Sequence, residues 1–252
     1  MSGLPGQLGL WCGDSGKILG NLHAVQDLGF DYLIARAVIH PHGRIAAYEP
    51  ANLKQLITDA ATINLPVYAW AYIYPTHIDN QIRAIADAVP ESCVNLVLDA
   101  EVEWEKIPQG AALAHQLVHG IAEAMGHRAD LHLSTFCNPE SHPLPMTAFL
   151  AHCESFMPQS YRIPPTRTQT VLQRTLKQCP PLAVQSLGNL LIPTVNRPEM
   201  LAAVAAHPTA FPGANVWLWD GDKQDPGVAG IEGTWMSAIK AFHDAHPTSA
   251  PG

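Results

Sequence analysis

Apolar, β-rich runs alternate with helical patterns along the 252 residues of this chain, and this alternation constrains the fold more than any other feature. A helical pattern follows each run, either directly or after a short loop. Such alternation is typical of parallel sheets, in which each helix returns the chain to the start of the next strand. Eight units in about 250 residues predict a single closed (β/α)8 TIM barrel of the α/β class. The eight expected strands cover residues 8–13, 32–40, 66–74, 94–102, 130–136, 155–161, 182–187 and 214–219.

The segments between these runs have helical periodicity. Leu53, Leu56 and Ala60, for example, recur on one face of a helix. An open doubly wound sheet is the main alternative, but no Gly-x-Gly-x-x-Gly motif follows the first strand. Proline and glycine are spread along the chain without forming a linker. We therefore expect one barrel domain over residues 1–244 and a flexible tail, rich in Pro, Ser and Gly, over residues 245–252.

Composition narrows the classes of function. The formal net charge is -8, and the 14 Lys and Arg residues form no basic run, which disfavours binding to nucleic acid or to an anionic membrane. Uncharged ligands such as sugars fit better. No signal-peptide pattern and no stretch of about 18 apolar residues occurs, so we expect a cytoplasmic protein with no membrane insertion. The 5 cysteines lie far apart without a Cys-x-x-Cys pair, which favours reduced thiols over a zinc site or a disulfide framework.

The segment LVLDAEVEWE, residues 96–105, has the strongest functional signal. An apolar run, typical of a strand buried on both faces, ends in the alternating acids Asp99, Glu101 and Glu103, whose side chains should point to one side. An ionised carboxylate away from water costs several kcal/mol unless it is paired, protonated or in use. The alternative is that these acids cap the next helix or form an ion pair in a loop.

Two carboxyls at this spacing suit glycoside hydrolysis. Residues two apart on a strand lie about 6.5–7 Å apart at Cα, so Asp99 and Glu101 can flank one scissile bond. The reaction needs a protonated carboxyl as general acid and an ionised one to stabilise the oxocarbenium-like centre. Mutual repulsion and aromatic walls should raise the pKa of one of them. We expect Glu101, with its longer side chain, to be the acid and Asp99 the stabiliser, while Glu103 either binds sugar or forms an ion pair.

Aromatic and polar side chains gather at the ends of other strands, where the active site of a (β/α)8 barrel lies. Sugar rings stack on aromatic side chains, and their hydroxyls need carboxylate, amide or guanidinium partners. The alternative is that the inward aromatic residues simply fill the barrel interior. Besides Glu103, the expected substrate-binding residues are Trp11, Arg36, Trp70, Tyr72, Tyr74, Gln159, Tyr161, Trp219 and Asp220.

Three short motifs suggest a family. Asp99-Ala100-Glu101 ends the fourth expected strand, Arg36-Ala37 lies in the second, and Trp217-Leu218-Trp219 ends the eighth. Together they resemble glycoside hydrolase family 25, the lysozyme-type N-acetylmuramidases, and the looser set of glycoside-hydrolase-like barrels around it. The first strand of that family usually has a Gly-x-Asp pattern, where this chain has Gly9-Leu10-Trp11.

The resemblance implies cleavage of an N-acetylated glycan, first of all peptidoglycan, as in muramidases and endolysins. It also implies that Asp99 orients the N-acetyl group of the substrate for substrate-assisted attack. Another glycan substrate is the alternative. A wall-degrading enzyme without an export signal would reach its substrate on cell lysis or inside a delivered particle.

Two other functions stay open. His40, His42 and His77 follow the second and third strands, and with Asp99 they would offer mixed N and O ligands for a hydrolytic metal, although their spacing is not diagnostic. A barrel that binds glycan without cutting it, or that has a structural role, is compatible with the same fold. We expect no metal and no cofactor, a glycan as the binding partner, and a monomer.

Overall fold

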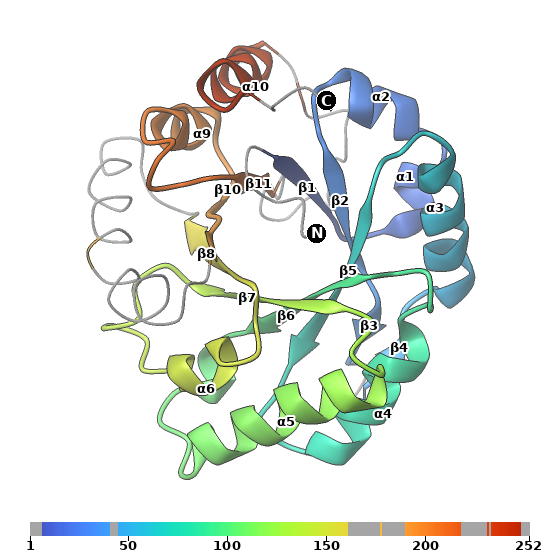
Figure 1. Ribbon diagram of the computed structural model, residues 1–252, viewed down its shortest axis with the longest axis vertical. Helices are drawn as coiled ribbons and strands as arrows, with labels where there is room; N and C mark the ends of the chain where they lie inside the picture. Colours follow the sequence, from blue (N-terminus) through green and yellow to red (C-terminus); the bar gives the residue numbers. More distant parts are fainter. Residues whose placement is uncertain are drawn as a thin grey trace.

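The computed structural model describes residues 7–40, 45–160, 177, 190–217, 231 and 233–247. Parallel strands in the order β10-β11-β1-β2-β5-β6-β7-β8-β9 form one sheet, and an additional pairing between β8 and β10 closes it into a barrel (Figure 1). The predicted (β/α)8 barrel is therefore confirmed. Its strands are β1 (Leu8–Cys12), β2 (Tyr32–Arg36), β5 (Val67–Ile73), β6 (Asn95–Ala100), β7 (Asp130–Phe136), β8 (Ser155–Ser160), β9 (Leu190–Leu191), β10 (Thr194–Val195) and β11 (Ala214–Val216).

The seventh position of the barrel differs from the expectation. The run expected there, residues 182–187, lies outside the described residues, and the position is taken by β9 and β10, further along the chain. Leu190 of β9 pairs with Ser155 at the start of β8, and Thr194 of β10 pairs with Gln159 near its end. The two short strands thus follow β8 in succession, and β10 also pairs with β11.

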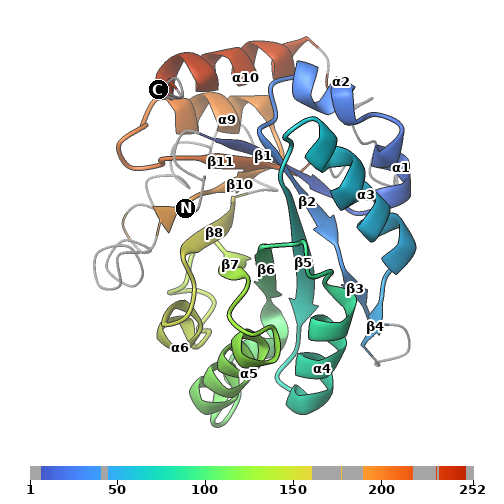
Figure 2. The same cartoon turned by 45° about the vertical axis from the view of Figure 1, so that its right-hand side comes forward.

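The second strand is shorter than expected. It ends at Arg36, and residues Val38–Ile39 (β3) turn away to pair antiparallel with Ala46–Ala47 (β4). This small hairpin follows the carboxyl end of β2 and packs near the helix that follows β5 (Figure 2). Arg36 is therefore the last residue of β2 at the barrel mouth.

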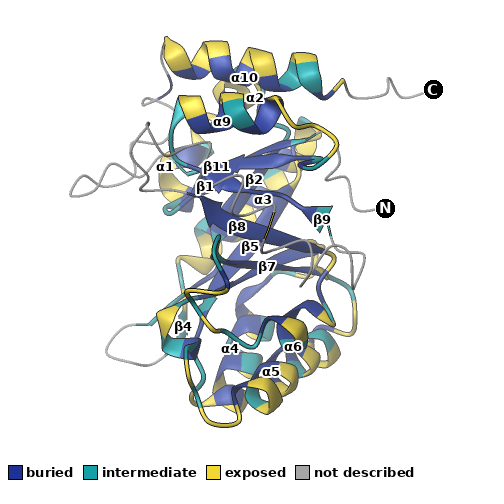
Figure 3. Ribbon diagram, turned by 90° about the vertical axis from the view of Figure 1, so that its left-hand side faces the viewer, coloured by how far each residue is buried: buried dark blue, intermediate teal, exposed yellow. Residues whose placement is uncertain are grey.

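Helices surround the sheet, with their outward faces exposed and their inward faces buried (Figure 3). The apolar periodicity explains this arrangement, because Leu53, Leu56 and Ala60 form the buried stripe of the helix that follows β4. The helices in the described residues are α1 (Ser15–Leu19), α2 (Leu22–Asp27), α3 (Pro50–Thr62), α4 (Ile78–Ala88), α5 (Gly110–Ala124), α6 (Met146–Leu150), α9 (Pro198–Ala205) and α10 (Thr234–Ala245), with a short 3-10 turn at Val102–Trp104.

The end of the domain lies beyond the expected boundary at residue 244. Helix α10 runs to Ala245, and His246 is buried, with its Nε2 2.8 Å from the carbonyl oxygen of Phe211. His246, which was expected in the tail, is therefore packed against the domain, and residues 248–252 lie outside the described residues. Within the described part of the chain, no helix combines the length and apolarity needed to span a membrane.

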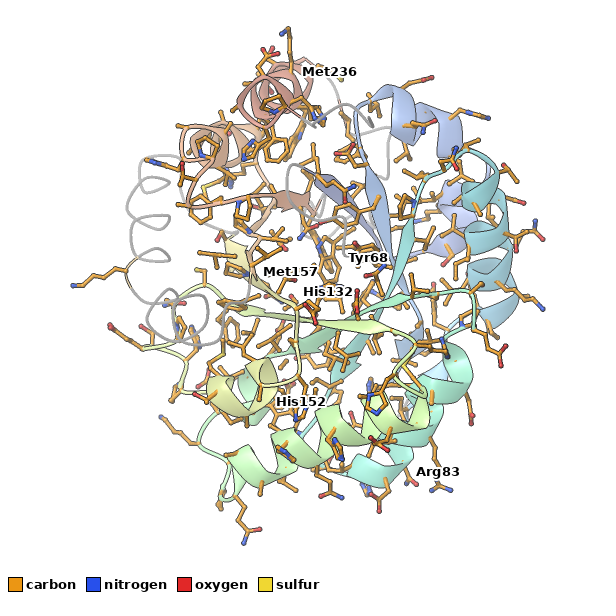
Figure 4. The ribbon with its side chains drawn as sticks, in the orientation of Figure 1. Tyr68, Arg83, His132, His152, Met157 and Met236 are labelled. Carbon is orange, nitrogen blue, oxygen red and sulfur yellow. The ribbon has the colours of Figure 1, made fainter. Side chains whose placement is uncertain are left out.

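The barrel has an aromatic interior that is separate from the larger apolar core between strands and helices. In Figure 4, Tyr68, His132 and Met157 lie at the centre of the ring of strands, whereas Arg83 and Met236 project from its outside. The interior thus contains both apolar and polar layers. Its buried apolar members are Trp11, Tyr32, Ile34, Tyr68, Trp70, Val97, Met157 and Ile192.

A polar layer lies at the amino-terminal end of the interior. The Tyr32 hydroxyl donates to Oδ1 of Asn215 at 2.5 Å, and the ring of His132 lies between Ser155 Oγ at 2.9 Å and Asn95 Oδ1 at 3.2 Å. Burial lowers the pKa of His132 to about 3. The histidine is therefore neutral in the folded protein at neutral pH, and its ring connects Ser155 and Asn95 by hydrogen bonds.

Replacing Gly9 by Ala should destabilise the barrel by about 1–3 kcal/mol through overpacking. A Cβ at this position would collide with Oδ1 of Asn215 and with the ring of Tyr32, which hold each other by a hydrogen bond. Urea unfolding measures the loss. Gly20→Ala is the matched control, because a Cβ there meets nothing within 4 Å; equal losses for both variants would contradict this packing.

Acid should destabilise the protein through His132. Unfolded histidine takes up a proton near pH 6.5, whereas the buried ring resists protonation down to about pH 3, so stability falls as the pH drops through this window. The loss between pH 7 and pH 5 is about 2 kcal/mol. Urea unfolding at both pH values should show a smaller loss in His132→Gln than in the wild type. The same loss in both proteins would contradict the assignment.

Candidate active site

The acidic segment places two carboxylates on the same side of β6, at the barrel mouth. Nε2 of Gln159, on β8, donates to Oδ1 of Asp99 at 2.7 Å and to Oε1 of Glu101 at 3.1 Å. The same nitrogen lies 3.2 Å from Oγ of Ser134 on β7. Because one amide contacts both carboxyls, Asp99 and Glu101 face a common space, as their spacing on the strand predicts.

The two carboxyls differ in depth. Asp99 is 3% exposed, whereas Glu101 follows the last residue of β6 and is partly exposed. Burial raises the pKa of Asp99 well above its ordinary value, and the negative charge of Glu101 raises it further, against the hydrogen bonds from Ser134 and Gln159. Burial thus favours the protonated form of the deeper Asp99, which the sequence assigned as the stabiliser. Depth in the barrel, which the sequence does not give, explains this raised pKa.

Glu103 belongs to the same group of acids. The hydroxyl of Tyr72, on β5, donates to Oε2 of Glu103 at 2.7 Å and lies 3.5 Å from Oε2 of Glu101. Burial, this hydrogen bond and the nearby acids raise the pKa of Tyr72. The phenol therefore stays protonated and connects the two glutamates. Tyr74 packs against the ring of Tyr72, with ring centroids 5.0 Å apart.

Next to the acids, at the ends of β1, β2 and β5, lies an aromatic half that contains the cation Arg36. The Arg36 guanidinium carbon lies 4.8 Å from the ring centroid of Trp70 and 5.3 Å from that of Tyr48. Trp11 packs between Trp70 and Trp217, at centroid distances of 5.5 and 5.2 Å. Trp11 and Trp70 are each only 4% exposed, so they form the floor of this half, whereas Trp217 is partly exposed.

Some site residues were not singled out from the sequence, and some expected ones cannot be placed. Ser134 shares the inward phase of β7 with His132, a strand pattern that would have indicated it. Tyr48 follows β4 and has no comparable sequence signal. Residues Tyr161, Trp219, Asp220 and His42 lie outside the described residues.

Of the histidines considered for the alternative metal site, His40 makes other contacts. Nε2 of His40 lies 2.8 Å from the backbone carbonyl oxygen of Tyr72, and its ring packs edge-on against Tyr74. His77 is exposed at the start of α4. Among the residues that the structure describes, no group of three or more His, Cys, Asp or Glu side chains is arranged to hold a metal ion.

Comparison with known proteins supports the barrel. No protein-family model and no curated protein sequence matches this chain. Solved structures that are similar include the chitinase ICChI from Ipomoea carnea, with 12% identity, a TM-score of 0.62 and coverage of 94% of this chain and 99% of that one. The maltogenic α-amylase AmyB from Thermotoga neapolitana has 9% identity, a TM-score of 0.58 and coverage of 96% and 77%.

A citrate lyase from Burkholderia xenovorans LB400 is similar to the same degree, with 13% identity, a TM-score of 0.57 and coverage of 94% and 76%. These neighbours are enzymes on the same fold, and they include both glycoside hydrolases and a lyase. At such low identity the likeness shows the fold alone, because one barrel supports many chemistries. Function must therefore be argued from the site.

The buried Asp99 should cost stability at neutral pH. Its folded-state pKa is raised above the unfolded value, so the cost appears as the pH rises above about 4 and is absent below that, where the carboxyl is protonated in both states. Asp99→Asn should stabilise the protein at pH 7 by about 1–2 kcal/mol. Thermal unfolding at pH 7 and pH 3.5 should show a gain only at the higher pH.

The exposed Asp87, on the outer side of α4, provides the matched control. Asp87→Asn should change stability by about 0.5 kcal/mol or less at either pH. A pH-independent gain in Asp99→Asn, or an equal gain in both variants, would show that burial of the Asp99 charge is not its source.

Proposed function

We propose that this protein is a glycoside hydrolase that cleaves an N-acetylated glycan. The observation that carries the proposal is the amide of Gln159, which holds Asp99 and Glu101 together at the mouth of the barrel. Active sites of (β/α)8 enzymes lie at this end, where the strands present their carboxyl termini. Facing aromatic side chains supply surfaces on which sugar rings stack.

The spacing of the carboxyls favours a reaction with retention of configuration. The two oxygens that share the Gln159 amide lie 2.7 and 3.1 Å from one nitrogen, so they are closer together than the roughly 6.5 Å at which inverting pairs begin. Inverting enzymes need the wider spacing to place a water molecule between sugar and base. The facing oxygens of this site are closer together than that.

We assign the general acid to Glu101, because its side chain lies nearer the opening than that of Asp99. Its proton passes to the glycosidic oxygen as the bond from that oxygen to C1 breaks, while the acetamido oxygen of the substrate bonds to C1. Water then attacks C1 and gives a proton to Glu101. This attack breaks the bond between C1 and the acetamido oxygen. Asp99 acts as the deeper partner whose proton and hydrogen bonds orient Glu101 and the acetamido group, and Tyr72 and Glu103 bind at the rim.

Peptidoglycan is the first candidate substrate, on the resemblance of the short motifs to family 25 muramidases. The first strand departs from that family, because Trp11 stands where the Gly-x-Asp pattern has its acid. The Trp11 ring packs into the aromatic floor. The proposed chemistry does not use a first-strand acid, since Asp99 and Glu101 are both supplied by the segment at the end of β6. A related N-acetylated glycan would contact the same two carboxyls, Asp99 and Glu101.

Glu101→Gln should keep the fold and reduce glycan cleavage by about 100- to 10,000-fold, the usual contribution of a general acid. Turbidity loss of a peptidoglycan suspension and reducing-end release from chitin oligomers measure the activity. Glu123→Gln, on the exposed face of α5, is the matched control and should retain full turnover. Undiminished turnover in Glu101→Gln would refute the assignment, and glycan capture without cleavage by the wild type would favour a binding module.

A further inference from the structure

Arg36 stands at the end of the inward-facing row of β2. Tyr32 and Ile34, four and two residues earlier, belong to the aromatic interior of the barrel. Arg36 pairs in register with Trp70 of β5, and its guanidinium lies over the Trp70 ring. Its charge is therefore held at the barrel mouth, on the aromatic half.

The two rings fix the guanidinium without using its donors. Trp70 and Tyr48 contact it by cation–π interactions at 4.8 and 5.3 Å, which leave the in-plane N–H groups free to bind a planar acceptor. Nε of Arg36 is buried, and among the described residues it has no hydrogen-bond partner. No ion pair joins the Arg36 side chain to another residue in the described part of the chain.

Two acids near Tyr48, Asp14 and Glu49, form hydrogen bonds with residues other than Arg36. Oδ1 of Asp14 accepts from the backbone nitrogen of Gly16 at 2.9 Å, where it caps α1. Oε2 of Glu49 accepts from Asn52 at 2.9 Å. Withdrawing a charged donor from water without an acceptor is costly, so a site built this way gains most when a ligand brings the acceptor.

Resting on the glycosidase function, we propose that the substrate is an acidic glycan and that Arg36 binds a carboxylate on the sugar next to the scissile linkage. A carboxylate matches the guanidinium fork with two parallel hydrogen bonds. The neighbouring half, with Asp99, Glu101 and Glu103, repels a carboxylate and so directs it toward Arg36. The separated charges thus fix the direction of the glycan across the mouth.

Matched substrates test this inference. Glycan strands of peptidoglycan freed of their peptides have a free lactyl carboxylate on every second sugar, and amidation of these groups removes the charge with little change in shape. The wild type should cleave the free-acid strands with a kcat/KM roughly tenfold or more above that for the amidated strands. Arg36→Gln should abolish this preference, mainly through a higher KM for the acidic strands.

Arg83→Gln, which removes an equal charge from the exposed face of α4, should retain the preference. A preference that survives in Arg36→Gln, or a wild type that cleaves both strands equally, would overturn the role of Arg36 and leave the hydrolase function standing. If the wild type cleaves neither strand, the hydrolase function fails, and calorimetric titration with the acidic strands decides the inference. Binding lost in Arg36→Gln would support the carboxylate site, and absence of binding to the wild type would overturn it.

Discussion

The site depends on one amide that binds two carboxylates. Gln159 lies on β8, while Asp99 and Glu101 belong to the segment that ends β6, with β7 and its Ser134 between them. Three strands must therefore be in register for these groups to meet. Parallel pairing provides that register, because it places Asp99 beside Ser134 and Gln159 beside Phe136. The barrel therefore positions the hydrogen-bonding groups of Ser134 and Gln159 that stabilise the buried Asp99.

Asp99 and Glu101 differ in their exposure to solvent, because Asp99 is buried and Glu101 is partly exposed. The deeper carboxyl has a raised pKa because it has lost water and lies beside the charge of Glu101. The outer carboxyl can meet a ligand directly. Such a division of roles arises from depth along one strand, and it is the arrangement by which paired carboxyls perform acid and base steps at neutral pH. The hydrogen bond from Tyr72 to Glu103 extends the same network outward.

The barrel mouth is divided into an acidic half and an aromatic half. The acids gather at the end of β6, while Arg36 lies against Trp70 and Tyr48 on the neighbouring side. An extended glycan that spans both halves would meet different chemistry at successive sugars. Under the proposed function, this asymmetry would select an orientation of the glycan as well as a substrate, because reversing the glycan would bring like charges together.

The sequence by itself determined the fold class and the position of the acids. Strand and helix periodicities are local properties, and they predicted the closed barrel, the shared side of Asp99 and Glu101, and the inward Gln159 at the end of β8. The seventh strand, at β9 and β10, lies further along the chain than its expected position. Only the tertiary structure decided that burial raises the pKa of Asp99, that Trp11 and Trp70 form a floor, and that Tyr48 meets Arg36. These properties depend on burial and on contacts between distant segments, which no local pattern of residues specifies.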